Sequence, residues 1–186
     1  MNKVALKVAR RETGKKAAKD YRKSGMVPGV FYQDGKENYS LLASPADLKQ
    51  LVYTNEAKIV ELEIEGVSGT KTCFVKEMKF HPVTDKLIHF DLLGLVEDKK
   101  TTFVLPISLT GSSIGVKEGG VLQQNLYRMK VKCLPKDLVP SLVVDVTNLA
   151  VGKVIQVGDL KSDTLEFVLP ASTTVVQVTK SRTAKA

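Results

Sequence analysis

Short runs in which apolar and polar residues alternate recur along the chain, and they limit what it can fold into. The clearest run lies between Lys58 and Glu65, where Val60, Leu62 and Ile64 alternate with three glutamates. A period of two places the two sets of side chains on opposite faces of a β-strand. Because such runs follow one another with turn residues between them, the chain is predicted to be mainly β with a few short helices.

The first half of the sequence contains signals for six strands and two short helices. One helical pattern begins after Gly14 and ends at Ser24-Gly25, where the glycine can adopt the left-handed conformation. A second begins at Ser44-Pro45, with serine as N-cap and proline at the first helical position. Asp34-Gly35 predicts a hairpin turn. The strands are expected over residues 2–9, 27–32, 39–43, 58–65, 71–80 and 86–93.

The apolar pattern breaks at Glu97–Lys100, which predicts a linker between two domains. Beyond it the sequence carries only strand signals, at the spacing typical of a small sandwich or barrel. These strands are expected over residues 101–110, 121–126, 128–134, 142–146, 154–157, 165–169 and 175–179. We therefore expect a first domain over residues 1–93, an all-β domain over 94–179 and a disordered basic tail over 180–186.

Positive charge is concentrated in the first thirty residues. They hold nine lysines and arginines against Glu12 and Asp20, in a chain with a formal net charge of +8. Residues 31–179 hold 16 basic and 18 acidic side chains. A local cationic segment favours a polyanion such as nucleic acid, because each cation that meets a phosphate releases condensed counterions. The alternative is a solvated helix face that keeps the protein soluble.

The cations lie on one side of the first predicted helix. Lys15, Lys19 and Arg22 form a single stripe on a helical wheel, with Lys16 and Lys23 beside it. The opposite side carries Ala17, Ala18 and Tyr21. Like charges at this spacing repel each other by a few tenths of a kcal/mol per pair. An anionic partner relieves that repulsion, so the arrangement favours nucleic-acid binding.

The sequence argues against several other classes of protein. No apolar run approaches the roughly 18 residues of a membrane span, and the N-terminus lacks an apolar signal core. Cys73 and Cys133 stand alone, which is typical of a reducing compartment and not of a zinc motif. His81 and His89 are joined by a turn and a strand, which disfavours a metal centre, and no serine or threonine has the setting of a nucleophile. We expect no cofactor, no metal and no catalytic residue.

His89 and Asp91 are neighbours on one face of a predicted strand, about 6 to 7 Å apart. Such a pair can reach the 2′-hydroxyls and base edges of structured RNA. The alternative is a surface histidine beside a solvated aspartate. The chain has few aromatic residues and no tryptophan, which disfavours a stacking platform for single strands and makes structured nucleic acid the expected partner.

Several segments, taken in order, resemble a known family. They are RRETGKKA at residues 10–17, RKSGMVPGVFY at 22–32, HPV at 81–83 and IHFDL at 88–92, then LPISLTG at 105–111, GVKEGG at 115–120 and VDV at 144–146. Together they are similar to the bacterial large-subunit ribosomal protein family that binds 5S ribosomal RNA. The match extends over nearly the whole chain and includes the long two-domain form often called the general stress protein Ctc.

The resemblance implies a first domain built as a small β-barrel with helices, similar to the anticodon-binding domains of some tRNA synthetases, and a second, all-β domain. It also implies that the first domain docks on the irregular, loop-containing helix of 5S RNA. The RNA-contacting positions of the family fall on Arg10, Lys15, Lys19, Arg22, Tyr32, His89 and Asp91, to which we add Lys16 and Lys79. Family members commonly carry a further basic residue where this chain has Asp20. They commonly carry a glutamine where it has Lys79, which here exchanges an amide for a point charge.

These expectations describe a structural, non-enzymatic ribosomal protein of the cytoplasm, monomeric away from the ribosome. Its partners would be 5S ribosomal RNA and the large subunit, with neighbouring ribosomal proteins as contacts of the second domain. Two alternatives stay open. One is a stress-response or assembly factor that binds RNA transiently and acts through the second domain, because residues 95–179 hold nine basic and eight acidic side chains. The other is a hydrolase with a His/Asp metal centre.

Overall fold

The computed structural model describes residues 3–35, 37–52, 54, 56–162 and 164–180. The chain divides into two compact units, Met1–Lys99 and Lys100–Ala186. The predicted boundary after Leu93 lies six residues earlier than this division. Gly94 is part of the last strand of the first unit, where it pairs with Cys73.

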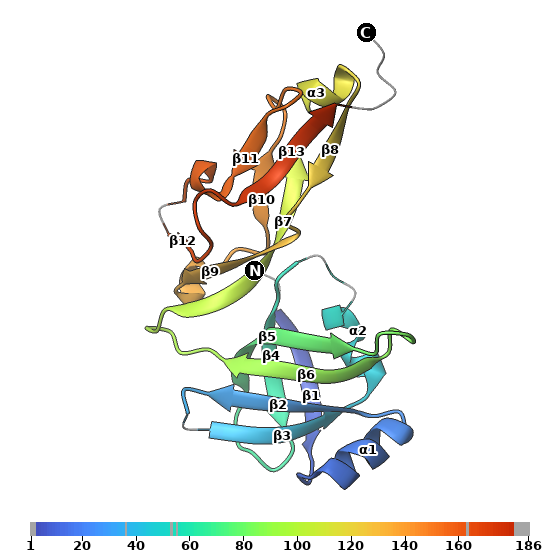
Figure 1. Ribbon diagram of the computed structural model, residues 1–186. Helices are drawn as coiled ribbons and strands as arrows, with labels where there is room; N and C mark the ends of the chain where they lie inside the picture. The colour runs from blue at the N-terminus through green and yellow to red at the C-terminus, as the bar shows by residue number, and fades with distance from the viewer. Residues whose placement is uncertain (1–2, 36, 53, 55, 163, 181–186) are drawn as a thin grey trace. The chain divides into compact units, whose positions relative to one another are not determined.

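Six strands of the first unit close into a barrel, in the order β1-β3-β2-β6-β5-β4. Figure 1 shows β3, β2, β6 and β5 side by side. Parallel pairing of β1 with β4 and of β2 with β6 closes a ring of otherwise antiparallel strands. The expected small barrel is confirmed. The strands are β1 (Lys3–Arg10), β2 (Val27–Gln33), β3 (Glu37–Ala43), β4 (Ile59–Ile64), β5 (Lys71–Phe80) and β6 (Leu87–Gly94).

The alternating residues of these strands fill the barrel. Val60 and Leu62 of β4 are fully buried, as are Phe31 and Phe90. Fully burying an apolar side chain of this size stabilises a fold by roughly 1.5 to 3 kcal/mol. The Phe90 ring fits because residue 29 is glycine, since a Cβ there would lie 2.4 Å from Cζ of Phe90.

The two predicted helices of the first unit are confirmed. α1 (Lys15–Lys23) is followed by Gly25 at a φ of 81°, in the left-handed region that glycine favours. α2 (Pro45–Val52) is capped by Ser44, whose hydroxyl oxygen accepts a hydrogen bond of 3.3 Å from the Asp47 amide. Its buried residues are Leu48 and Leu51.

Two cations of the basic N-terminal segment are paired within the barrel surface. The parallel register of β1 and β4 places Lys3 beside Glu61 at 2.8 Å and Lys7 beside Glu63 at 2.9 Å. The hydrogen bond to Glu61, and then its charge, raise the pKa of Lys3. The polar side of β4 is therefore matched by lysines from β1, and the free positive charge of the segment begins further along the chain.

The second unit contains two sheets, in the orders β10-β7-β9-β12 and β11-β13-β8. Its buried residues include Phe103, Leu105, Val131 and Val176. The expected mainly β architecture is confirmed. The strands are β7 (Thr101–Thr110), β8 (Gly120–Gln124), β9 (Arg128–Cys133), β10 (Leu142–Asp145), β11 (Val154–Gln156), β12 (Glu166–Phe167) and β13 (Thr174–Lys180).

The sequence did not predict α3 (Ile114–Lys117), a single helical turn of the second unit. Two 3-10 turns, Pro135–Asp137 and Val157–Asp159, were also not predicted. The sequence of α3 has no clear helical signal, because it contains Gly115 and glycine is a poor helix former. A tertiary contact fixes it instead: the Gly115 amide donates to the Leu149 carbonyl at 2.9 Å, and a Cβ would lie 2.6 Å from the Val151 nitrogen.

The predicted disordered tail begins one residue too early. Lys180 belongs to β13, where it pairs with Gly120 of β8. Residues 181–186 lie outside the described part of the chain. Within the described ranges, no helix has the length and apolar character needed to cross a membrane.

Candidate nucleic-acid interface

Helix α1 presents the predicted cations to solvent. Lys15, Lys16, Lys19 and Arg22 are exposed. The residues on the other side, Ala17, Ala18 and Tyr21, are half-buried. Among the described residues, none of the lysines of α1 forms an ion pair. Their charges are therefore left for an external anion.

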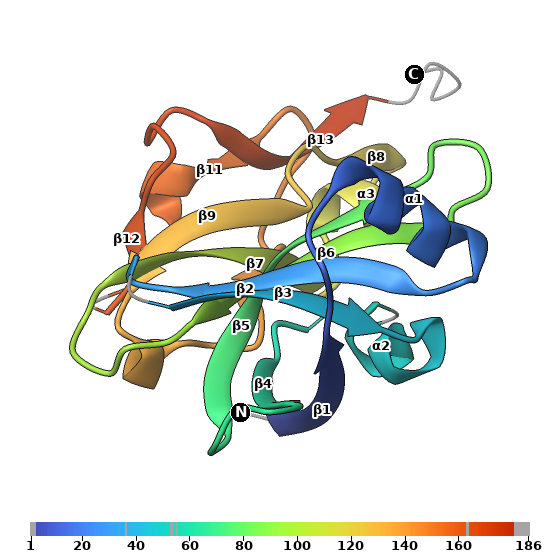
Figure 2. The same cartoon turned by 90° about the horizontal axis from the view of Figure 1, so that it is seen from below.

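Arg22 connects this helix to the barrel. Its Nε donates a hydrogen bond of 3.0 Å to the main-chain carbonyl of Ile88, the second residue of β6. α1 leads directly into β2, which runs parallel to β6, so the helix lies at the end of the barrel where both strands begin. Figure 2 shows α1 and the connection between β5 and β6 at this end. Arg22 therefore has a structural contact in addition to its predicted contact with RNA.

The remaining predicted residues, except Arg10, lie on one surface beside the helix. We call it the outer face; it is formed by the side chains that point away from the barrel core on β2, β6 and β5. The strand register pairs His89 with Lys79 and Asp91 with Glu77. Alternation places their sequence neighbours Phe90 and Leu92 in the core. The outer face consists of Tyr32, Lys76, Glu77, Lys79, His89 and Asp91.

His89 and Asp91 form a close pair in the middle of the outer face. Nδ1 of His89 lies 2.7 Å from Oδ1 of Asp91, and both side chains are about three-quarters buried, with exposed fractions of 24% and 22%. Oδ1 of Asp91 is buried and has no hydrogen-bond partner within the described residues, so the 2.7 Å approach of Nδ1 is a close polar contact. The carboxylate lies against one imidazole nitrogen and leaves Nε2 as the second polar atom of the ring.

Lys79 is partly compensated on its own strand. Its Nζ lies 3.8 Å from Oε2 of Glu77, and both side chains are exposed. An exposed pair at this distance is weak, so the Lys79 ammonium can exchange its partner for a phosphate at little cost. The outer face therefore carries both signs of charge in similar number, whereas α1 holds five cations and a single acidic residue, Asp20.

Arg10 is set apart from the outer face. It pairs with Leu41 of β3 and has the same alternation phase as Leu6 and Val8, whose side chains are buried. Its guanidinium carbon lies 5.4 Å from the centroid of the Tyr39 ring. The structure thus places Arg10 at the end of β1, over a ring that packs against the barrel core.

His81, the second histidine considered for a metal site, holds the turn between β5 and β6. Its Nδ1 accepts main-chain hydrogen bonds from Val83 at 3.2 Å and from Thr84 at 3.3 Å. Within the ranges that the structure describes, no three histidine, cysteine, aspartate or glutamate side chains are placed to share a metal ion. Cys73 is buried in the barrel core, and this burial raises the pKa of its thiol to about 12.

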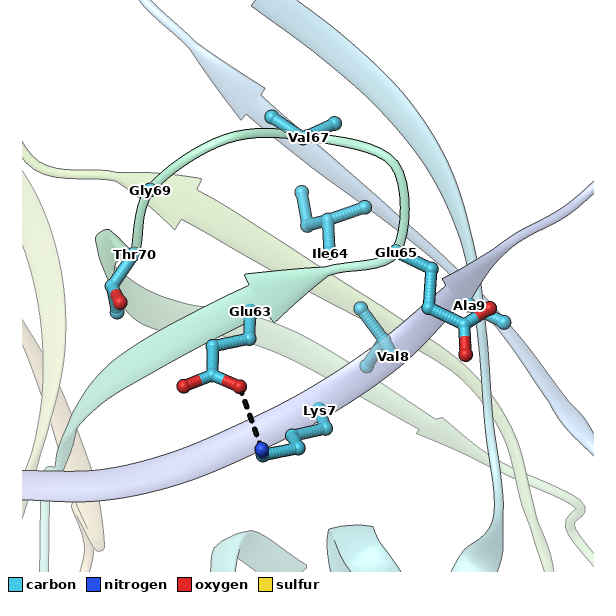
Figure 3. A pocket seen from close by; sticks show the side chains of 9 residues that line it. All are labelled: Lys7, Val8, Ala9, Glu63, Ile64, Glu65, Val67, Gly69 and Thr70. Carbon is cyan, nitrogen blue, oxygen red and sulfur yellow. Dashed lines mark ion pairs between the residues drawn. The ribbon is translucent and has the colours of Figure 1, made fainter.

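The candidate interface is separate from two hollows of the surface. The larger hollow, of about 590 Å³, lies between the ends of β1 and β4 and the connection that follows β4 (Figure 3). Lys7 and Glu63, which form an ion pair, lie on its wall. A second hollow, of about 430 Å³, belongs to the second unit. None of the nine predicted RNA-binding residues lines either hollow.

Sequence reasoning missed Lys76. The ladder between β5 and β6 shifts between Val75 and Glu77, which leaves Lys76 as an extra residue on the outer face. The available signal was the loss of alternation in Val75-Lys76-Glu77-Met78, where two consecutive polar residues separate two that pack against the core. Such a break is typical of a β-bulge.

Comparison with known proteins gives matches over both units. The Ribosomal L25p family matches residues 6–92, and the family described as ribosomal protein TL5, C-terminal domain, matches residues 100–182. A large ribosomal subunit protein bL25 from Porphyromonas gingivalis is 39% identical over 176 residues, covering 95% of this chain and 91% of the relative. The bL25 protein of Azobacteroides pseudotrichonymphae is 38% identical over 186 residues, covering 100% and 97%.

A third relative extends the range of organisms. The bL25 protein of Chlorobium phaeovibrioides is 35% identical over 181 residues, covering 96% of this chain and 89% of the relative. Proteins of this family are structural and not enzymes. The chain belongs to the bL25 family of large ribosomal subunit proteins, in the long form that carries a TL5-type C-terminal domain.

Proposed function

We propose that the chain is a structural component of the large ribosomal subunit that binds 5S ribosomal RNA through α1 and the outer face. The observation that carries this proposal is the hydrogen bond from Arg22 to the carbonyl of Ile88. It fixes a helix with unpaired lysines beside the strand that bears His89 and Asp91. One rigid surface then offers both phosphate-binding charge and polar groups that can read an RNA helix.

The two parts of the surface would have different tasks. The ammonium groups of Lys15, Lys16 and Lys19 supply affinity by contacting phosphates, which position RNA without reading its sequence. The minor groove of an RNA helix is wide and shallow and displays 2′-hydroxyls and base edges, so the outer face of a barrel can approach it. Its major groove is too narrow for such an approach.

The His89–Asp91 pair supports a reading role. A carboxylate repels phosphates, so Asp91 on this surface would cost affinity unless it orients His89 or accepts a hydrogen bond from a base. The distance of 2.7 Å between Nδ1 and Oδ1 fits the first of these roles. Nε2 of His89 would then meet a 2′-hydroxyl or a base edge.

The second unit would contact neighbouring ribosomal proteins, not RNA. Residues 100–179 hold eight basic and six acidic side chains, so this unit carries only a small excess of positive charge before the C-terminal residues. It exposes Tyr127 and Val143, with exposed fractions of 68% and 63%. Exposed aromatic and apolar side chains are a feature of protein–protein contacts. The assembled particle would lie in the cytoplasm.

Binding of the full-length chain to 5S ribosomal RNA tests the proposal. We expect tight binding to 5S RNA, weaker binding to an unrelated RNA hairpin of equal length, and a steep fall in affinity with salt. Equal binding to the two RNAs would contradict the reading role, and absence of binding at low salt would contradict the whole proposal. Sedimentation of cell extracts separates a permanent subunit component from a factor that joins the ribosome only under stress.

A further inference from the structure

A β-bulge on β5 brings an additional cation to the outer face. Val75 pairs with Leu92 and Glu77 pairs with Asp91, so Lys76 has no partner of its own on β6. Val75 before the bulge and Met78 after it both pack against the barrel core. The extra residue lets the strand keep both apolar contacts while Lys76 and Glu77 are exposed one after the other.

The ammonium of Lys76 rests on an aromatic ring. Its Nζ lies 5.3 Å from the centroid of the Tyr32 ring, within the distance of a cation–π contact. Tyr32 belongs to β2 and Lys76 to β5, with β6 between them. The lysine therefore reaches across one strand to the ring, which holds it at a defined place on the outer face.

Within the described part of the chain, no carboxylate forms an ion pair with this ammonium. By contrast, Lys79 on the same strand lies 3.8 Å from Glu77. Lys76 thus resembles the lysines of α1: its charge is exposed and unpaired by acid. It differs from them because an aromatic contact restricts where its ammonium lies.

The same contact changes the expected role of Tyr32. A base that stacks on a tyrosine needs access to a face of the ring. In this structure the ammonium of Lys76 lies over the ring, so stacking there would first require Lys76 to move away. A lysine already restricted by the ring loses less side-chain freedom when it meets a phosphate.

We propose that Lys76 is a phosphate-binding residue of this surface and that Tyr32 is a positioning residue that acts through Lys76. The inference rests on the proposed function, because it takes the outer face to be the surface that meets 5S RNA. It adds a contact to the predicted set and reassigns Tyr32 from direct RNA contact to support of a cation.

A double-mutant cycle in the full-length protein tests this inference. Affinity for 5S RNA is measured over a salt series for the wild type, Lys76→Gln, Tyr32→Leu and the double variant. One lost phosphate contact reduces the slope of log affinity against log salt by roughly 0.7 to 0.9. We expect this reduction for Lys76→Gln, several-fold weaker binding for Tyr32→Leu, and little further loss in the double variant.

Two further variants serve as controls. Tyr32→Phe keeps the ring and removes the hydroxyl, and we expect binding close to that of the wild type. Lys49→Gln removes the same charge from an exposed position on α2, which packs on the β1 side of the barrel, and should leave the slope unchanged. Circular dichroism and thermal unfolding establish that each variant is folded.

An unchanged slope for Lys76→Gln would overturn the phosphate contact, and this variant needs no change in the core. The positioning role would be overturned if Tyr32→Leu lowered RNA affinity by the same factor in the wild type and in the Lys76→Gln variant. Tyr32 would then act on RNA directly. A loss for Tyr32→Phe as large as that for Tyr32→Leu would also overturn it. These failures leave wild-type binding to 5S RNA intact, whereas failure of the proposed function abolishes it.

Discussion

The imidazole of His89 lies 2.7 Å from the carboxylate of Asp91, on a strand whose neighbouring residues Phe90 and Leu92 are fully buried. The rigid barrel core therefore fixes the positions from which the two polar side chains extend. The pair places a negative charge on a surface that is proposed to meet phosphates. Removing that charge should therefore change RNA affinity in a direction that depends on the role of Asp91.

Asp91→Asn should have opposite effects on two RNAs. It removes a negative charge, so binding to an unrelated hairpin should become slightly tighter. If the carboxylate orients His89 for reading, binding to 5S RNA should weaken, by roughly 1 to 3 kcal/mol for a lost specific contact. Titrations of both RNAs at one salt concentration measure the two effects. Tighter binding to both would mean that Asp91 is only a solvated surface carboxylate.

Arg22→Lys should separate charge from position. Lysine keeps the positive charge and lacks the Nε–H group that donates to the Ile88 carbonyl. We expect the salt slope of 5S binding to stay near the wild-type value while affinity falls, because α1 is held less firmly against β6. Arg22→Gln should lower both quantities. An affinity for Arg22→Lys equal to that of the wild type would show that the hydrogen bond to the Ile88 carbonyl is not needed for binding.

Gly29→Ala should destabilise the first unit. The new Cβ would meet the Phe90 ring at 2.4 Å, and overpacking of a core typically costs about 1 to 3 kcal/mol. Chemical denaturation measures the change. Phe90→Leu in the same protein removes the obstructing ring, so the double variant should be more stable than the sum of the two single effects predicts. Additive losses would contradict a direct clash between these two positions.

The two cysteines should report unfolding of the two units separately. Cys73 and Cys133 are buried, and desolvation raises the pKa of both thiols, that of Cys73 to about 12. The folded state keeps the thiols protonated, so their contribution to stability is present at neutral pH. It falls as pH rises above the ordinary thiol pKa, because only the unfolded chain then releases protons. A thiol reagent at pH 8 should modify neither cysteine until its unit opens, as mass spectrometry can follow.

Local patterns in the sequence were sufficient to predict most strands and both helices of the first unit. The alternation in Lys58–Glu65 matches β4, and Ser44-Pro45 marks the start of α2. Side-chain periodicity and capping are properties of a few consecutive residues, so they can be read directly. The parallel pairings of β1 with β4 and of β2 with β6 join distant segments, and no local pattern specifies them.

Local patterns also predicted part of the candidate site. They could not predict the contacts that join distant segments. The cationic stripe of α1 follows from helical spacing, and the common face of His89 and Asp91 follows from strand spacing. The contacts from Arg22 to Ile88 and from Lys76 to Tyr32 connect separate elements, so only the fold reveals them. The extra residue at Lys76 also interrupts the two-residue alternation of β5, from which the face of each side chain is predicted.

In the proposed complex, the unpaired lysines of α1 bind phosphates of 5S ribosomal RNA. A salt series compares the wild type with Lys15→Gln/Lys16→Gln/Lys19→Gln, and with Lys49→Gln as a control of charge alone. We expect the triple variant to bind more weakly, with a slope of log affinity against log salt that is smaller by about two units or more. Parallel lines for the wild type and the triple variant would contradict the proposed phosphate contacts.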